Sequence, residues 1–149
     1  MPRFALFDLL RWIHFVFVAM AGGAAATALV LSGLEEEHRE YRGLASVLWR
    51  RVVAWGFRLA VATGLLLVAF QFQQGGHPFD ARYLPVKLVL AALLLIVSEG
   101  SAGALAKAKR GAPLLAMLFF LLASFVGVNR QAFGRTPSAP PELSAAPAE

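Results

Sequence analysis

One group of polar side chains stands beside the apolar stretches of this sequence and could form a binding site. His14 lies in the stretch RWIHFVFVAMAGGAAATALVLSG, and Lys87 lies near the start of PVKLVLAALLLIVSEG. One His, one Lys and neighbouring Arg side chains suit an anionic group such as a propionate, or a metal with nitrogen and oxygen ligands. The ends of apolar stretches that face the same side contribute His14, Lys87, Arg82 and Arg130, with His77, Asp80, Tyr83 and Asn129 beside them.

These residues also have a simpler interpretation. Lys87, Arg82, Trp12 and Tyr83 are of the types that anchor helices at a membrane–water interface. A single His on a helix is commonly a packing residue. The sequence therefore leaves His14 open between a ligand and a packing residue.

Two opposite charges stand deeper in the apolar stretches. Arg58 lies about 9 Å into its stretch, counted from Val52 at about 1.5 Å per residue, and Glu99 lies at a comparable depth in another. An ion pair between them would neutralise both charges, whose burial in hydrocarbon is costly. The pair is a structural clamp in one interpretation and part of a proton or substrate path in the other. A further alternative has Arg58 reaching toward the headgroups while Glu99 is protonated.

The candidate metal ligands are few. Met20 is a soft ligand suited to copper, but it follows His14 by six residues, which separates the two by about 120° around a helix. The sequence has no cysteine, which excludes thiolate sites and disulfides. A haem held between two helix histidines is not expected, because His38 and His77 fall in loops. A five-coordinate haem, or one bound by His with Lys or Met, stays open.

The apolar stretches are the elements that must position these residues. Of the 149 residues 58% are hydrophobic and 15% charged, more apolar surface than a soluble domain of this length can bury. Four stretches approach the roughly 20 residues that cross a membrane as a helix. We predict an all-α integral membrane protein whose residues 1–135 form an up-and-down bundle of four transmembrane helices, followed by a disordered Pro/Ala-rich tail at 136–149. The predicted spans are about 9–32, 52–72, 85–106 and 113–133.

The charge distribution indicates orientation rather than nucleic-acid binding. The net charge is +5, but the basic residues lie mostly at the ends of apolar stretches. Two basic loops, EEEHREYRGLASVLWRR and KAKRG, fall on one side of the predicted bundle. The excess of positive charge in cytoplasmic loops predicts that these loops are cytoplasmic and both termini outside. The expected location is the bacterial inner (plasma) membrane, with the lipid bilayer as partner.

Small residues predict where helices approach one another. Small side chains at helical spacing allow close backbone contact, or leave clearance for a flat cofactor. They are Gly22, Gly23, Ala25 and Ala26 in the first stretch and Gly56, Ala60 and Gly64 in the second.

Three segments resemble a known family. RWIHFVFVAMAGG looks like the first helix of the superfamily that joins copper-resistance protein D (CopD) with the HemJ-type protoporphyrinogen oxidases. LWRRVVAWGFRLAVATGLLL resembles its basic entry and second helix, and YLPVKLVLAALLLIVSEG resembles its third. The chain has Ser98 and Glu99 where the HemJ-type branch has a Tyr–His-like pair. The resemblance is therefore to the superfamily rather than to one branch.

The resemblance implies a four-helix membrane protein and three hypotheses. In the HemJ-type branch His14 would be associated with haem b and Lys87 would be required for protoporphyrinogen oxidation, which makes the chain a haem-dependent oxidoreductase with Arg82 or Arg130 at the propionates. In the copper branch His14 and Met20 would hold or move copper. A third hypothesis, independent of the resemblance, is a structural or assembly subunit of a larger membrane complex. A homo-oligomer is compatible with each of them.

Overall fold

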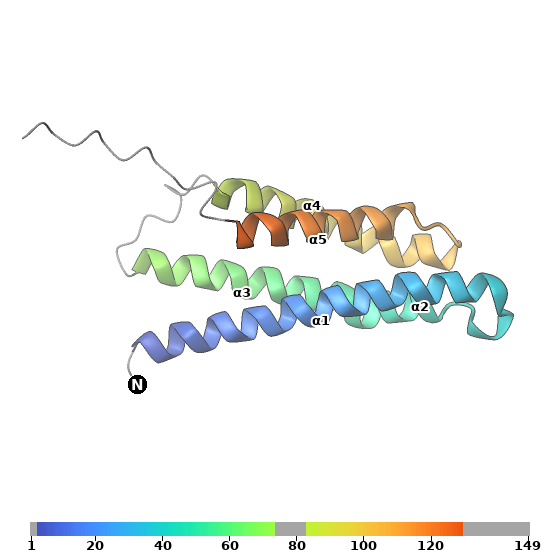
Figure 1. The fold of residues 1–149 in the computed structure, drawn as a ribbon, viewed down its shortest axis with the longest axis horizontal. Helices are drawn as coiled ribbons and strands as arrows, with labels where there is room; N and C mark the ends of the chain where they lie inside the picture. The colour runs from blue at the N-terminus through green and yellow to red at the C-terminus, as the bar shows by residue number, and fades with distance from the viewer. Residues whose placement is uncertain (1–2, 74–82, 130–149) are drawn as a thin grey trace, which may run out of the picture.

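The computed structural model describes residues 3–73 and 83–129, and all regular structure in these ranges is helical. The four long helices alternate in direction along the chain, so the bundle is up-and-down (Figure 1). Four helical segments have the length and hydropathy of membrane spans, which confirms the predicted all-α class. The long helices are α1 (Arg3–Glu37), α3 (Ala54–Gln73), α4 (Tyr83–Ala106) and α5 (Gly111–Val128).

The second helical segment begins earlier than the predicted start at Val52. A short 3₁₀ turn, η1 (Arg39–Tyr41), is followed by α2 (Leu44–Leu48) and a π-helical turn, η2 (Trp49–Val53), which continues into α3. The prediction of a loop as far as Arg51 is therefore wrong.

Local chemistry explains the early start. Gly43 has φ 88°, a left-handed conformation that glycine adopts without a steric penalty, so the chain can reverse there. Glu35 then accepts a hydrogen bond of 2.6 Å from the backbone N–H of Ala45. That bond satisfies one of the N–H groups left unpaired in the first turn of α2. The acidic run at the end of α1 thus holds the start of α2.

The other helix ends also differ from the prediction. α1 continues past Ser32 to Glu37. α5 ends at Val128, whereas the predicted fourth span runs to Phe133. Residues 130–133 and the predicted tail at 136–149 lie outside the described residues.

Small residues set the closest helix contact. A Cβ atom at Gly56 of α3 would lie 2.8 Å from Cβ of Ala21 in α1, so only glycine allows the two helices to meet there. Gly22 and Ala25 are buried as predicted, but Gly23 and Ala26 face outward. The predicted small-residue stripe on α1 is therefore only half correct.

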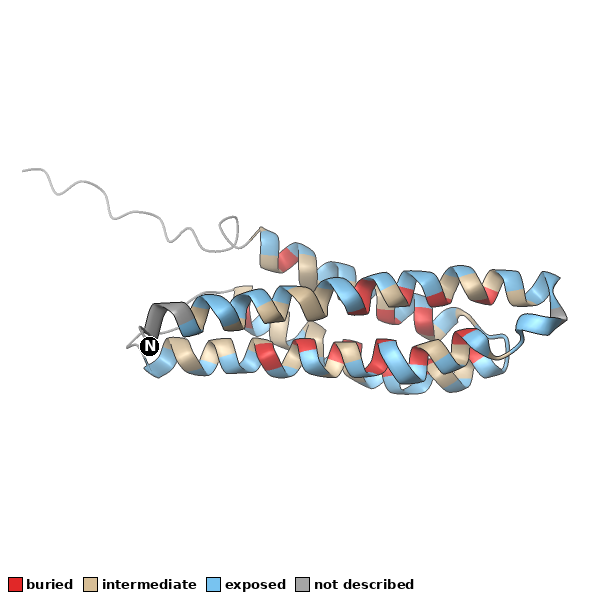
Figure 2. Cartoon of the chain, turned by 90° about the horizontal axis from the view of Figure 1, so that it is seen from below, coloured by how far each residue is buried: buried red, intermediate tan, exposed pale blue. Residues whose placement is uncertain are grey.

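Trp49 is the largest fully buried side chain of the described core. Its Nε1–H donates to the backbone oxygen of Ser98 at 3.1 Å, and its ring meets Phe57 edge-on at 6.5 Å. Buried residues gather toward the end of the bundle where α1 leads into α2 (Figure 2). In α1, no residue in 6–20 is buried. The half of the bundle that holds the start of α1 is therefore packed less tightly.

The outer surface of the bundle is apolar. Large side chains on three helices are more than two-thirds exposed, namely Trp12 and Val30 in α1, Ile96 in α4 and Val128 in α5. Water solvates such a surface poorly, whereas the hydrocarbon chains of lipid solvate it well. The exposed faces thus have the composition of lipid-facing helices.

Candidate functional site

His14 makes a side-chain contact that fixes its ring. It lies on α1 in the less tightly packed half of the bundle, and its Nδ1 is 3.0 Å from Oγ1 of Thr63 on α3. Thr63 is buried and His14 is partly buried. The ring also lies close to Gly64, where an added Cβ would come within 3.2 Å of its Cε1. The site thus begins with a histidine seated on a Thr–Gly pair.

The hydrogen bonds of Thr63 decide which ring nitrogen is free. Its hydroxyl lies 2.8 Å from the carbonyl oxygen of Leu59 and 3.0 Å from that of Ala60. A hydroxyl has one hydrogen, and a threonine on a helix commonly donates it to a backbone carbonyl of the preceding turn. Oγ1 therefore accepts from Nδ1–H of His14, and the neutral ring keeps its lone pair on Nε2. Histidines that bind metals commonly have this arrangement, with the second ring nitrogen held by a fixed acceptor.

Lys87 lies near the start of α4, at the end of the bundle where α1 begins and His14 lies (Figure 1). Within the described residues the side chain has neither a hydrogen bond nor an ion pair. It packs against Gly127 of α5, where an added Cβ would be 3.0 Å from Nζ. A half-buried cation that has no counter-ion among the described residues, in the same half of the bundle as a histidine, suits an anionic ligand.

Of the remaining predicted members of this group, Tyr83 and Asn129 lie at helix ends and four others are not described. Arg82, Arg130, His77 and Asp80 lie outside the described residues. Tyr83 begins α4. The described part of the site consists of His14 and Lys87 with their contacts Thr63, Gly64 and Gly127.

Met20 has different surroundings from His14. It is 57% exposed and lines a shallow groove with Phe17, Arg51 and Trp55. The structure does not bring it to the His14–Thr63 contact. Among the described residues, no three His, Cys, Asp or Glu side chains gather as a metal-binding group.

Arg58 and Glu99 form the ion pair that the sequence analysis considers. Nη2 of Arg58 lies 2.6 Å from Oε1 and 2.7 Å from Oε2 of Glu99, and Nε lies 3.0 Å from Oε1. The pair joins α3 to α4. Both side chains are exposed at the surface, with exposed fractions of 41% for Arg58 and 54% for Glu99. The pair thus lies on the surface of the bundle rather than sealed in its core.

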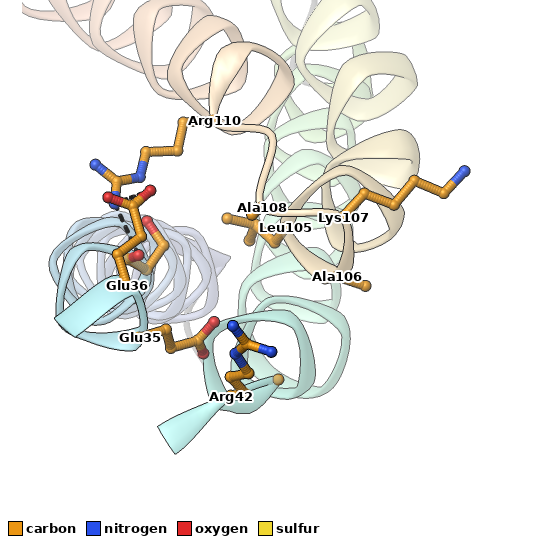
Figure 3. A pocket seen from close by; sticks show the side chains of 10 residues that line it. Glu35, Glu36, Arg42, Leu105, Ala106, Lys107, Ala108 and Arg110 are labelled. Carbon is orange, nitrogen blue, oxygen red and sulfur yellow. Dashed lines mark hydrogen bonds and ion pairs between the residues drawn. The ribbon is translucent and has the colours of Figure 1, made fainter. Parts of the chain in front are cut away.

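A cavity of about 300 Å³ with charged residues in its lining lies at the opposite end of the bundle from His14. Nη2 of Arg110 pairs with Glu36 at 2.8 Å and donates to the backbone oxygen of Ser32 at 2.8 Å. Arg42 and Glu35 stand on another wall of the cavity, and Lys107 points away (Figure 3). The contacts of its charged groups fasten the end of α1 to α2 and to the start of α5.

Sequence reasoning missed two residues of the His14–Lys87 site and one residue of the core. Thr63 and Gly127 carry no motif, and Trp49 stands in a segment predicted as a loop. A usable signal for Thr63 was its position beside Gly64, because a hydroxyl within an apolar helix requires a partner. Gly127 and Trp49 had no comparable signal.

No protein-family model matches the chain, and neither a curated protein nor a solved structure matches it.

Proposed function

We propose that the chain is a multi-pass protein of the bacterial inner membrane that binds one haem b through His14 and takes part in redox chemistry. The length and hydropathy of the four helical segments and their exposed apolar faces support the membrane placement. The resemblance to the CopD/HemJ superfamily supports the class of chemistry, with a porphyrinogen as the substrate type.

The arrangement of the connections supports an orientation. The α1–α2 and α4–α5 connections lie at the same end of the bundle (Figure 1). They carry the basic residues Arg42, Lys107, Lys109 and Arg110. By the positive-inside rule this end is cytoplasmic, both termini are outside, and the His14 site lies in the outer half of the membrane.

The single observation that carries the haem proposal is the His14–Thr63 hydrogen bond. It fixes the ring and leaves Nε2 as a ligand, as an axial histidine requires. Gly64 and Gly127 have no Cβ, and the room that this leaves is taken by the His14 ring and the Lys87 ammonium group. The fit to the group rests on the donor types, because an imidazole suits the iron of a haem and an ammonium group suits a propionate. Lys87 would hold a propionate, and Arg82 and Arg130 stay predicted contacts.

Each residue then has a defined task. The haem, when bound, supplies one-electron redox chemistry at its iron. His14 would orient the group, Thr63 would fix the tautomer of His14, and Lys87 would balance the charge of an anionic edge or substrate carboxylate.

An absorption spectrum tests the proposal. We expect wild-type protein purified in mild detergent to show a Soret band that shifts on dithionite reduction. His14→Ala should lose the band, while Met20→Leu, which alters a residue away from Thr63, should retain it. A folded wild-type protein without a band contradicts the proposal. Copper in that sample by metal analysis would favour the copper hypothesis, and neither cofactor would favour the structural subunit.

Thr63→Val is expected to weaken haem binding by about 10- to 100-fold, the usual cost of losing a group that orients a metal ligand. Valine has nearly the shape of threonine but no oxygen to accept from Nδ1–H of His14. Thr63→Ser keeps the hydroxyl and should bind within a few-fold of wild type. Haem titration followed at the Soret band measures both variants. Equal affinities for the Val and Ser variants would show that the hydrogen bond does not orient a ligand.

A further inference from the structure

The Arg58–Glu99 ion pair occupies an unusual place for a membrane bundle. Arg58 is fourteen residues after Leu44, or about 21 Å along the second helical segment at about 1.5 Å per residue. Glu99 is seven residues before the end of α4. Both side chains are nonetheless about half open to the surroundings of the bundle. Ionised groups within a membrane usually face protein or water, so this face calls for a cover.

The pair has hydrogen-bonding capacity left on its open side. Nη1 of Arg58 makes no hydrogen bond to any described residue, and Oε2 of Glu99 accepts one bond. The Trp55 ring covers one side of the guanidinium, with Cζ 4.9 Å from the ring centroid. The exposed side of the pair therefore presents a hydrogen-bond donor, Nη1 of Arg58, beside an acceptor, Oε2 of Glu99. Hydrocarbon forms a hydrogen bond with neither.

The helix that carries Glu99 is shaped for a close neighbour. Gly100 and Gly103 follow Glu99 on α4, and both are exposed with nothing within 4 Å of an added Cβ. Ile96, one turn before Glu99, is 69% exposed. A second helix can therefore bring its backbone near the charges without displacing any side chain of this chain.

We propose that a second copy of this chain covers the α3–α4 face, so that Glu99 of each copy pairs with Arg58 of the other. The proposal rests on the membrane placement given above. Arg58 and Glu99 lie side by side at one depth. A two-fold axis along the membrane normal therefore places Arg58 of one copy opposite Glu99 of the other, at the same depth.

Other occupants satisfy only half of the pair. A lipid phosphate attracts Arg58 but is repelled by Glu99, and a partner helix with a single basic residue satisfies Glu99 alone. A second copy presents both charges with the spacing required. The four charges then form a closed ring in which the free Nη1 donors have acceptors.

Charge reversal and mixing test the proposal. Arg58→Glu gives a copy with two carboxylates on this face, and Glu99→Arg gives a copy with two guanidinium groups. Each variant alone should dimerise at least about tenfold more weakly than wild type, because like charges meet. Mixed in equal amounts with different affinity tags, the two should form heterodimers about as tight as the wild-type dimer. Native mass spectrometry in mild detergent counts the species. A wild-type monomer, or a mixture that stays monomeric although both variants are folded, overturns the proposal.

Cysteine cross-linking in isolated membranes keeps the proposal testable where a reversal variant fails to fold. The chain has no cysteine, so one introduced residue reports on one position. Ile96→Cys lies ten residues before the α4 end at Ala106, and the control Leu121→Cys lies ten residues after the α5 start at Gly111. Both side chains are exposed, 69% and 53% respectively. We expect the Ile96 variant to form a disulfide dimer and the Leu121 variant to remain a monomer. No dimer at Ile96, equal dimer at both positions, or an adduct of another mass overturns the proposal.

A third measurement separates this proposal from the proposed function. Alkaline carbonate extraction of the same membranes tests membrane placement. A chain that is released contradicts the membrane proposal itself. A chain that stays in the membrane and fails to cross-link at Ile96 contradicts only the dimer. The Soret band of the same sample reports on haem independently of both.

Discussion

Replacing Trp49 with alanine is expected to lower the free energy of unfolding by about 3–5 kcal/mol, the usual range for removing a large aromatic side chain from a core. The indole ring has no exposed surface, and it packs edge-on against Phe57. Its Nε1–H also donates to the backbone oxygen of Ser98, so the substitution removes the hydrogen bond that links η2 to α4. Reversible unfolding of the detergent-solubilised protein, followed by circular dichroism, measures the loss.

A second tryptophan provides the control for this prediction. Trp12 is 69% exposed on α1, so Trp12→Ala deletes the same atoms where little is buried. We expect it to change the free energy of unfolding by less than about 0.5 kcal/mol, as for most surface substitutions. Similar losses for both variants would mean that Trp49 does not organise the core.

The number and approximate place of the long helices could be predicted from the sequence because hydropathy reports on the solvent. Each of the four apolar stretches forms one long helical segment in the structure. These stretches surround Phe15, Leu66, Leu93 and Phe119. Length and apolarity are properties of a single segment, so a linear sequence displays them directly.

Helix ends could not be predicted from hydropathy because local polar contacts set them. Glu35 belongs to a charged run that looks like a loop, yet it accepts the N–H of Ala45. The charges of Arg50 and Arg51 led to the prediction that a loop ends at these residues. In the structure both are exposed residues of a continuous helical segment. A long basic side chain reaches outward from a helix without ending it.

The rotation of each helix was the hardest feature to predict. A helix that is apolar on every side offers no polar face to show which side is buried. Gly22 and Gly23 are adjacent and identical, but one is buried and the other exposed. The sequence could therefore nominate His14 and Lys87 for one site without showing that Thr63 holds the ring.

The Arg58–Glu99 pair shows both sides of this limit. The cost of an isolated charge in hydrocarbon predicts that two opposite charges at one depth find each other, and they do. Whether the pair faces inward or outward depends on helix rotation. The structure places the pair on the exposed surface of the bundle, and the dimer proposal follows from that placement.

Gly56→Leu is expected to lower the free energy of unfolding by about 3 kcal/mol, the upper part of the range for an overpacked contact. A Cβ at Gly56 would stand 2.8 Å from Cβ and 3.2 Å from the backbone Cα of Ala21, and a backbone atom cannot rotate away. α1 and α3 would have to separate. Gly23→Leu is the matched control, because nothing lies within 4 Å of a Cβ at Gly23. Thermal unfolding of the two variants side by side should show a loss for Gly56→Leu alone.

The same substitution links helix packing to the proposed haem site. Thr63 follows Gly56 by two turns on α3, and its hydroxyl meets Nδ1 of His14 at 3.0 Å across the α1–α3 contact. Helices pushed apart at Gly56 cannot keep that bond at its present length. We therefore expect Gly56→Leu to weaken the Soret band at a temperature where the protein is still folded, and Gly23→Leu to leave it unchanged. A full band in folded Gly56→Leu protein would mean that His14 is held by contacts other than Thr63, and the argument from its tautomer would no longer support a ligand.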